Sequence, residues 1–308
     1  MVTGQVAPPA VAQAACTCEN VAMNIAPALS PASTLVHSAF YRFTPVANPQ
    51  ATADALRARA HSLPDLQGAL LLATEGLNGA VSGSAETIAA FENWMTSSDF
   101  LDGACKGLMF KHSECRTPPF GRFKVVVKPE IVALGLPEFE ALPAPDEQDR
   151  THLSPQAWRA LIARDDVVVL DNRNHFEYRL GHFKGAVDPQ VRRFSDFVDY
   201  VLTHAPQWRA EGRPVAMYCT GGIRCDKTAP WMRSLGLDIY QLDGGILNYF
   251  AQLDDAHTDW AGECFVFDKR IALDTHMREA STTAEQVFDT QDPEERWRLE
   301  RALRLDQF

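Results

Sequence analysis

The sequence predicts a mixed α/β protein with two domains, an α+β domain of ferredoxin-like type followed by an α/β domain with a parallel sheet. A chain of 308 residues is long enough to bury two hydrophobic cores. In its first half, strand and helix patterns follow one another as β-α-β-β-α-β, the order of a split βαβ unit. In its second half, short apolar runs alternate with helical segments, which favours a parallel sheet flanked by helices.

Composition and charge exclude several classes of protein. Hydrophobic residues make up 46% and charged residues 22% of the chain, as in globular proteins, and no apolar run reaches the roughly 18 residues of a membrane span. The net charge of −11 gives no overall attraction to nucleic acid. Seven cysteines, an odd number, do not suggest a disulfide framework. We therefore expect reduced thiols, a cytoplasmic location and no contact with a membrane.

Residues 1–37 are rich in Ala and Pro and contain no Lys or Arg, so they lack the basic region of a secretory signal. We expect a disordered N-terminal extension, or an upstream extension of a reading frame that starts at Met23. Cys16 and Cys18 form a CxC pair, but no second pair lies close by, so we expect no metal site there.

The first domain is expected over residues 38–140, with strands at 38–46, within 67–84, at 107–116 and at 121–135. Helices are expected at 49–63 and 84–95, the first from the spacing of Leu56, Ala60 and Leu63. The segment 67–84 reads as two strands around a tight turn, whose turn residues are Gly76, Asn78 and Gly79. Glu75 and Asn78 are weaker candidates for a functional role.

Basic residues gather in the second part of this domain. Between Lys106 and Lys128 there are six Lys or Arg residues and a single acidic one, Glu114. On so acidic a chain this stretch is a candidate RNA-binding surface that contacts phosphates. The alternative is an ordinary solvated sheet face. The residues expected to contact RNA are Lys111, Arg122 and Lys124.

A polar, Pro-rich linker is expected at 141–154, and the second domain at 155–258. Its first helix starts with Ser154 as the N-cap and Pro155 in the first helical position. Further helices are expected at 195–205, 226–236 and 246–253, and strands at 165–171, 214–219 and 238–244. Residues 174–188 are expected to lead through a turn to the next short strand. The remainder, 259–308, is expected to be a C-terminal extension with a short amphipathic helix over its last sixteen residues, 293–308.

The segment CTGGIRC, residues 219–225, joins a buried strand to a helix. Ligands of parallel sheets bind beyond the carboxyl ends of the strands, where Cys219 and Asp171 are expected to lie. A short loop with two glycines can turn several backbone N–H groups toward one centre and form an anion nest, to which the helix dipole adds. These groups favour the thiolate of Cys219 and make it a nucleophile. The loop residues expected to form the nest are Thr220, Gly221, Gly222, Ile223, Arg224 and Cys225.

The size of this loop separates two kinds of chemistry. Tyrosine-phosphatase cradles have an Arg six positions after the Cys, whereas here the sixth position is Cys225 and the Arg comes one earlier. A tighter ring suits sulfur chemistry at a persulfide better than a phosphoryl group. Cys225 either resolves an oxidised Cys219 or simply packs.

The segment DNRNHFEYRLGHFKGA, residues 171–186, resembles the signature of rhodanese domains. Matching positions include Asp171, Arg173, Glu177 and Tyr178, together with the glycines and the His of the motif. The resemblance implies a rhodanese domain over about 155–258. In it, Asp171 and Arg173 have supporting, mainly structural roles.

A wider resemblance covers roughly residues 38–270. ATEGLNGAVSGS, then FKHSE with PFGRFKVVVKPEIVALG, then YCTGGIRCDKTAPWM, and finally GECFVFDKR are together similar to the tRNA uridine hydroxylase family. The resemblance implies oxygen-dependent 5-hydroxylation of the wobble uridine in tRNA, with Cys219 as the key residue and a persulfide as its intermediate. It implies tRNA as the partner, with no obligate protein partner. Many members carry a Cys-rich tail that suggests zinc; this chain has no Cys after Cys264, so we expect no metal.

The sequence contains no nicotinamide-binding or flavin-binding motif. Its histidines also show no spacing that would support a 2-His-1-carboxylate iron site. No cofactor is therefore evident, and dioxygen is expected as a co-substrate. The Cys219 thiolate either adds to the sixth carbon of uracil or carries a persulfide that reduces a peroxy species. Two other hypotheses stay open: a sulfurtransferase that moves sulfane sulfur between small thiols, and a non-catalytic tRNA-binding module.

Overall fold

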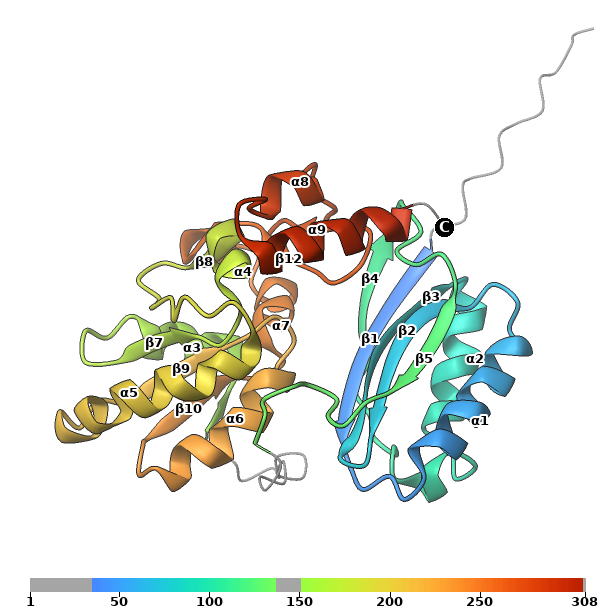
Figure 1. The fold of residues 1–308 in the computed structure, drawn as a ribbon, viewed down its shortest axis with the longest axis horizontal. Helices are drawn as coiled ribbons and strands as arrows, with labels where there is room; N and C mark the ends of the chain where they lie inside the picture. The colour runs from blue at the N-terminus through green and yellow to red at the C-terminus, as the bar shows by residue number, and fades with distance from the viewer. Residues whose placement is uncertain (1–34, 137–150, 307–308) are drawn as a thin grey trace, which may run out of the picture. The chain divides into compact units, whose positions relative to one another are not determined.

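The computed structural model describes residues 35–136 and 151–306, and these described residues belong to one compact unit (Figure 1). The expectations for residues 1–34 and 137–150, which include the CxC pair and most of the linker, lie outside the described residues. Among the helices of the described ranges, none is long and apolar enough to cross a membrane. The described elements confirm the mixed α/β class.

The first half of the unit is a five-stranded sheet in the order β4-β1-β3-β2-β5. Its strands are β1 (Leu35–Phe43), β2 (Gln67–Ala73), β3 (Gly76–Gly83), β4 (Lys111–Cys115) and β5 (Phe123–Val127). All neighbours are antiparallel except β2 and β5. Helices α1 (Pro49–His61) and α2 (Ala85–Met95) lie together against one face of this sheet, and η1 (Leu101–Gly103) follows α2 (Figure 1).

One hydrophobic core lies between this sheet and its two helices. Leu56 of α1 and Phe91 of α2 are fully buried against Leu70, Leu72 and Val81 of the sheet. Side chains on successive strand residues point to opposite faces, so one face of the sheet packs on the helices. The opposite face is left available for contacts with the second half of the chain.

The second half is built around a parallel sheet in the order β6-β10-β9-β7. Its strands are β6 (His152–Leu153), β7 (Val168–Asp171), β9 (Val215–Tyr218) and β10 (Ile239–Leu242). One core contains residues of α5 (Phe197–Ala210), which follows η2 (Phe194–Asp196), and of α6 (Ile223–Ser234). A second core, on the other face, contains residues of α3 (Pro155–Ile162) and α7 (Gly245–Gln252). Both faces are covered, as parallel sheets require.

Four expectations were wrong in detail. The tight turn is at Thr74 and Glu75, while Gly76, Asn78 and Gly79 are residues of β3. The segment 174–188, expected to lead through a turn to a short strand, contains helix α4 (His175–Leu180) before its short strand β8 (Gly181–Phe183). The expected linker ends earlier, because residues 152–153 form β6 beside β10. The first strand starts at Leu35 rather than at residue 38.

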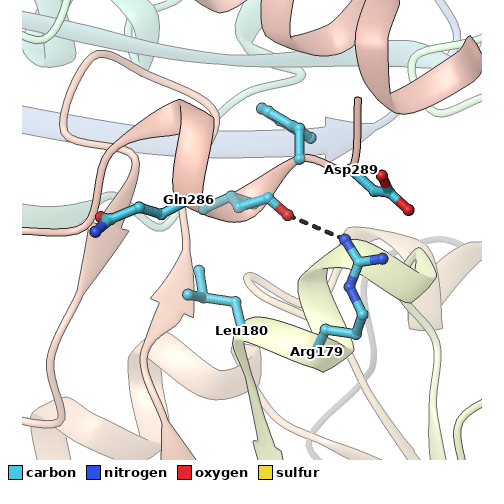
Figure 2. A pocket seen from close by; sticks show the side chains of 6 residues that line it. Arg179, Leu180, Gln286 and Asp289 are labelled. Carbon is cyan, nitrogen blue, oxygen red and sulfur yellow. Dashed lines mark hydrogen bonds between the residues drawn. The ribbon is translucent and has the colours of Figure 1, made fainter. Parts of the chain in front are cut away.

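The last part of the chain adds η3 (Ala256–Thr258), three short strands and two helices. Strand β11 (Trp260–Gly262) pairs with β8, and β12 (Cys264–Phe265) pairs with β13 (Ala272–Leu273). Helix α9 (Pro293–Asp306), preceded by α8 (Ala284–Val287), matches the amphipathic helix expected at 293–308. Its Leu299 packs with Phe176 and Phe265. A small cavity of about 300 Å³ lies between α4 and α8, where Arg179 donates to the Val287 carbonyl at 3.0 Å (Figure 2).

Candidate active site

Cys219 follows the last residue of β9, at the carboxyl edge of the parallel sheet. Its side chain is 1% exposed, and the backbone N–H of Gly222 donates to its Sγ at 3.1 Å. The short strand is fully buried, so the position of the sulfur is fixed by the sheet rather than by a free loop. A sulfur held this way accepts hydrogen bonds from the loop that follows it.

Several groups decide the protonation state of Cys219. Burial by itself raises the pKa of the thiol. Side-chain and backbone hydrogen bonds from Cys225, the charge of Arg224 and the Arg224 backbone N–H act in the opposite direction, and the pKa falls to about 6. The other four described cysteines have raised pKa values, chiefly through burial. Cys219 is therefore the thiolate among the described cysteines near neutral pH.

The loop around the sulfur is tight because glycines occupy its critical positions. Gly222 has a φ of 102°, and Gly245, at the start of α7, has a φ of 70°. A Cβ at Gly245 would lie 2.4 Å from the Cys219 carbonyl oxygen, which no side chain tolerates. Helix α6 begins at Ile223, so Cys225 lies in the first helical turn and not at the last loop position that we expected.

Arg224 faces Glu177 of α4 in a two-pronged ion pair. Its two terminal nitrogens lie 2.8 Å from the two oxygens of Glu177, and both side chains are buried. Burial raises the pKa of the Glu177 carboxyl, but the Arg224 charge and its hydrogen bonds outweigh that effect and hold it below its usual value. Thr220 Oγ1 also reaches Glu177, at 3.4 Å. The pair fixes the guanidinium beside the loop.

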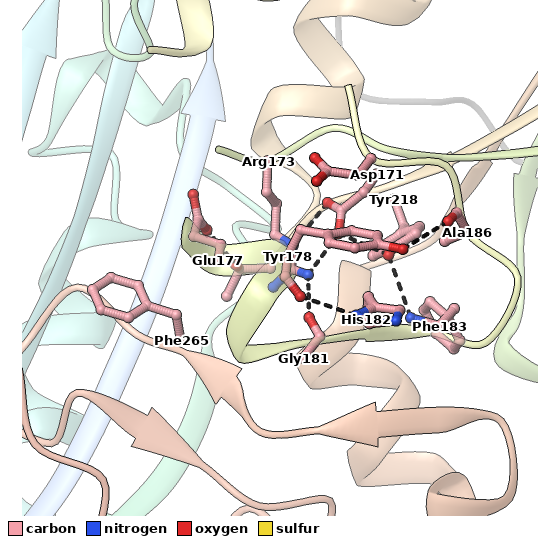
Figure 3. A network of polar contacts seen from close by, with 12 residues as sticks. Asp171, Arg173, Glu177, Tyr178, Gly181, His182, Phe183, Ala186, Tyr218 and Phe265 are labelled. Atoms are coloured by element: carbon pink, nitrogen blue, oxygen red, sulfur yellow. Dashed lines mark hydrogen bonds and ion pairs between the residues drawn. The ribbon is translucent and has the colours of Figure 1, made fainter. Parts of the chain in front are cut away.

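Asp171 and Arg173 lie in the interior, as a structural role requires. Arg173 binds Asp171 through two hydrogen bonds of 2.8 and 2.6 Å, and it also donates to the Gly181 carbonyl (Figure 3). Tyr218 donates its hydroxyl to Asp171 at 2.7 Å. All three side chains are fully buried. This network ties the ends of β7 and β9 to the start of β8 and so supports the strand end that carries Cys219.

Cys225 is enclosed on its own side by a polar cluster. Asn172 donates to its Sγ at 3.8 Å and to the Thr228 hydroxyl at 2.8 Å. Burial raises the pKa of the Cys225 thiol, and the neighbouring Cys219 raises it further. Cys225 therefore stays protonated and acts as a hydrogen-bond donor to Cys219.

The first sheet also contributes to this loop. Lys111 of β4 donates through its ammonium group to the carbonyl of Gly221 and, at 3.0 Å, to that of Gly244. Tyr41 of β1 donates to Asp226 at 2.7 Å, and its hydroxyl lies so close to Gly222 that a Cβ there would be 2.8 Å away. Two side chains from the first sheet therefore hold the outer side of the Cys loop.

A third contact joins α6 to the first half of the chain. Lys227 is 1% exposed, and its ammonium group lies 2.8 Å from both oxygens of Glu75 and also pairs with Glu130. It donates to the Val132 carbonyl at 3.0 Å as well. Glu75, which the sequence marked only as a weaker candidate, thus pairs with Lys227, three residues after Arg224 in α6.

A cavity of about 1160 Å³ lies beside Cys219 and is lined by residues of both halves and of α9. Eight Lys or Arg side chains line it against four Asp or Glu. The lining is therefore positive on a chain whose net charge is −11. Such a cavity attracts a polyanion toward the thiolate.

The residues expected to contact RNA are placed differently from one another. Lys124 is exposed and lines the cavity, together with Lys128. Arg122 is exposed but is not one of the cavity-lining residues. Lys111 points into the Cys loop, where it serves two carbonyls. In the described ranges, no group of three or more His, Cys, Asp or Glu is arranged to hold a metal ion.

Comparison with known proteins matches each half to a family. Residues 35–131 match the UPF0176 acylphosphatase like domain, and residues 154–252 match the rhodanese-like domain. A protein of Bradyrhizobium diazoefficiens called tRNA uridine(34) hydroxylase is 40% identical over 80% of this chain and 94% of its own length. The chain belongs to the tRNA uridine(34) hydroxylase family. Proteins of the same name from Nitrobacter winogradskyi (40%, covering 82% of this chain and 96% of theirs) and Deinococcus radiodurans (42%, 79% and 77%) agree.

The sequence did not reveal every residue that shapes this hydroxylase-family site. Tyr41, Asn172 and Lys227 were missed, because each acts through a contact distant in sequence; Asn172 and Lys227 lie within the quoted motifs, but the motifs give no sign of their partners. Glu177 was noted only as part of the rhodanese signature. The signal available for Lys227 was its charge inside a helix that follows the Cys loop.

Proposed function

We propose that this chain hydroxylates carbon 5 of uridine 34 in tRNA, with Cys219 as the reactive group and dioxygen as the co-substrate. The observation that carries the proposal is the ionised sulfur of Cys219 at the wall of a cavity with a positive lining. The chain belongs to a family of enzymes named for this reaction, and this membership also supports the proposal. Action on tRNA also fits the cytoplasmic location expected from the sequence.

The overall reaction consumes uridine, dioxygen, two electrons and two protons, and it yields 5-hydroxyuridine and water. A side chain that is 1% exposed has little reach into the cavity. A persulfide on Cys219 extends the reactive sulfur outward by one S–S bond, about 2 Å. The persulfide supplies the two electrons: one oxygen atom of dioxygen enters carbon 5 of the uracil and the other ends on the outer sulfur as Cys219–S–S–OH, with the S–S bond intact. Reduction of that group by two molecules of a cellular thiol restores the persulfide and releases water and a disulfide. The backbone and Cys225 donors hold the inner sulfur throughout.

The RNA would enter along the cavity, with its phosphates on Lys124, Lys128 and, farther out, Arg122. Lys124 and Lys128 have no carboxylate within ion-pair distance among residues 35–136 and 151–306. Phosphate contacts position an RNA without reading its sequence. Lys111 is the exception, because it positions the Cys loop and contributes its charge to the sulfur.

The test is nucleoside mass spectrometry of tRNA from cells that carry the wild-type gene, no gene, or Cys219→Ser. We expect 5-hydroxyuridine and its derivatives at position 34 to fall to the level of the gene-less strain in Cys219→Ser. Undiminished modification in that strain would rule out the proposal. The gain of one sulfur atom on the Cys219 peptide of the wild-type protein, and its disappearance after treatment with a thiol reductant, tests the persulfide separately.

A sulfurtransferase acting on small thiols is the second candidate, favoured by the ionised Cys219 alone. It gives no role to the exposed cavity lysines Lys124 and Lys128, whereas Lys111 would serve the thiolate in either reaction. Full-length protein is assayed with thiosulfate and cyanide, beside the nucleoside analysis of tRNA. Turnover of thiosulfate together with unchanged 5-hydroxyuridine in the gene-less strain would favour the sulfurtransferase.

A further inference from the structure

One wall of the large cavity combines an exposed aromatic ring, a buried guanidinium and a buried amide. Phe267, between β12 and β13, is 60% exposed although it is a large apolar side chain. Asn174, the N-cap residue of α4, is 5% exposed; its side chain faces the Glu177 backbone N–H as in a capping box, but its Oδ1 makes no hydrogen bond among the described residues. Both residues line the cavity that Cys219 lines.

Arg224 connects these two residues to each other. Its guanidinium carbon lies 5.8 Å from the centre of the Phe267 ring and 6.0 Å from that of Phe194. Glu177, which holds Arg224 at 2.8 Å, accepts a hydrogen bond from the Asn174 backbone N–H at 3.1 Å. The ion pair therefore fixes the guanidinium of Arg224 in this wall, and the exposed ring of Phe267 lies against it.

Each feature of this wall calls for a flat, polar-edged ligand. An exposed aromatic ring in a cationic cavity is how proteins stack the unpaired bases of single-stranded RNA. A buried amide oxygen without a partner costs free energy until a ligand donates to it. A side-chain amide offers one acceptor and one donor, and uracil presents a donor, N3–H, beside an acceptor, O4.

We propose that Phe267 and Asn174 form the subsite for the target uracil, Phe267 by stacking on its face and Asn174 by pairing with its N3–H and O4 edge. The inference rests on the proposed function, because it takes the substrate to be an unpaired uridine. Arg224 is a positioning residue here: it supports the ring of Phe267 while its backbone and charge stabilise the Cys219 sulfur. The uracil is then held on the wall next to the thiolate.

The test measures the binding of RNA without turnover, by fluorescence anisotropy on the full chain carrying Cys219→Ser. Two anticodon stem-loop RNAs serve as probes, one with uridine and one with 3-methyluridine at the wobble position, since a methyl group on N3 removes the donor. We expect the uridine probe to bind about tenfold more tightly. This comparison needs no further substitution, so it does not depend on how a variant folds.

Three variants assign the effect to residues. Phe267→Ala is expected to weaken both probes about tenfold, and Phe267→Trp to restore binding, because stacking needs a ring and not a particular one. Asn174→Ala is expected to remove the preference for uridine. The matched control is Leu202→Ala on α5, a side chain 50% exposed that does not line the cavity, which should change neither affinity.

Equal affinity for the two probes, or binding that Phe267→Ala leaves unchanged, would overturn the subsite while the proposed function stands. Failure to bind either probe, together with unchanged nucleoside levels in the gene-less strain, would overturn both. The two failures are therefore distinguishable.

Discussion

The ammonium group of Lys227 lies 2.8 Å from each carboxylate oxygen of Glu75 and so ties α6 to the turn between β2 and β3. The same group pairs with Glu130. The charged groups of Lys227, Glu75 and Glu130 therefore lie in contact, and the Lys227 side chain is only 1% exposed. Helix α6, which starts at the Cys loop, is in this way fixed to the first half of the chain.

Replacing Lys227 by Met should lower the free energy of unfolding by about 2 kcal/mol, because the partly exposed carboxylates of Glu75 and Glu130 and the Val132 carbonyl lose their charged donor. Urea denaturation followed by circular dichroism measures the change. Lys106→Met, on an exposed lysine, is the control and should change stability little. Equal changes in the free energy of unfolding for the two variants would contradict a stabilising role of the Lys227 ion pairs.

The alkylation rate of Cys219 by iodoacetamide should reach half its maximum near pH 6. A group whose pKa is lowered to about 6 is mostly thiolate at pH 7, whereas an unperturbed Cys is mostly thiol there. Tryptic mapping by mass spectrometry identifies the labelled cysteine. Cys225→Ala should move the midpoint upward, since it removes a hydrogen bond to the sulfur. A midpoint near 8.5 in the wild-type chain would refute the activated thiolate.

Lys111→Met should reduce tRNA hydroxylation at least tenfold and raise the pKa of Cys219. The substitution removes a positive charge near the sulfur and leaves the carbonyls of Gly221 and Gly244 without their donor. The alkylation profile described for Cys219 reports the pKa, and nucleoside mass spectrometry reports the activity. Lys124→Met is the matched control: it is expected to leave the alkylation profile in place. An unchanged profile in Lys111→Met would assign Lys111 to RNA contact alone.

The double variant Lys124→Ala, Lys128→Ala should weaken tRNA binding about tenfold and reduce the dependence of log affinity on log salt by about two. Both lysines line the cavity, and an RNA phosphate that no lysine neutralises keeps its counterion when the complex forms. Filter binding over a series of salt concentrations gives the slope. Lys106→Ala with Lys184→Ala, exposed residues outside the cavity, should leave it as it was. An unaltered slope in the cavity variant would show that the RNA phosphates do not bind at Lys124 and Lys128, so the RNA-binding surface would lie elsewhere.

Much of the fold was predictable because periodic apolar residues act locally. The spacing of Leu56 and Ala60 predicted α1, Ser154 and Pro155 predicted the start of α3, and the buried runs predicted β7 and β9. Helix α4 in the region 174–188 was missed, because it spans only His175–Leu180 and depends on the buried Glu177 for its position.

The site was predictable where one short segment carries it and not where two halves meet. The glycines of the Cys loop pointed to a nest around Cys219, and the Gly222 N–H lies there. The neutralisation of Arg224 by Glu177, the donors Tyr41 and Lys111, and the ring of Phe267 come from other elements. No spacing within one segment reports such contacts. The roles of these residues in catalysis stay predictions.

The crowding around Gly222 and Gly245 limits how this catalyst can be redesigned. An engineer who wished to accommodate a phosphoryl group would have to insert a residue between Cys219 and Arg224, yet even a Cβ added at Gly222 in this loop would meet the Tyr41 hydroxyl at 2.8 Å. Shortening Tyr41 would make room, but Asp226 would then lose its hydrogen bond. Conversion to a phosphatase therefore calls for coordinated changes in both halves of the molecule.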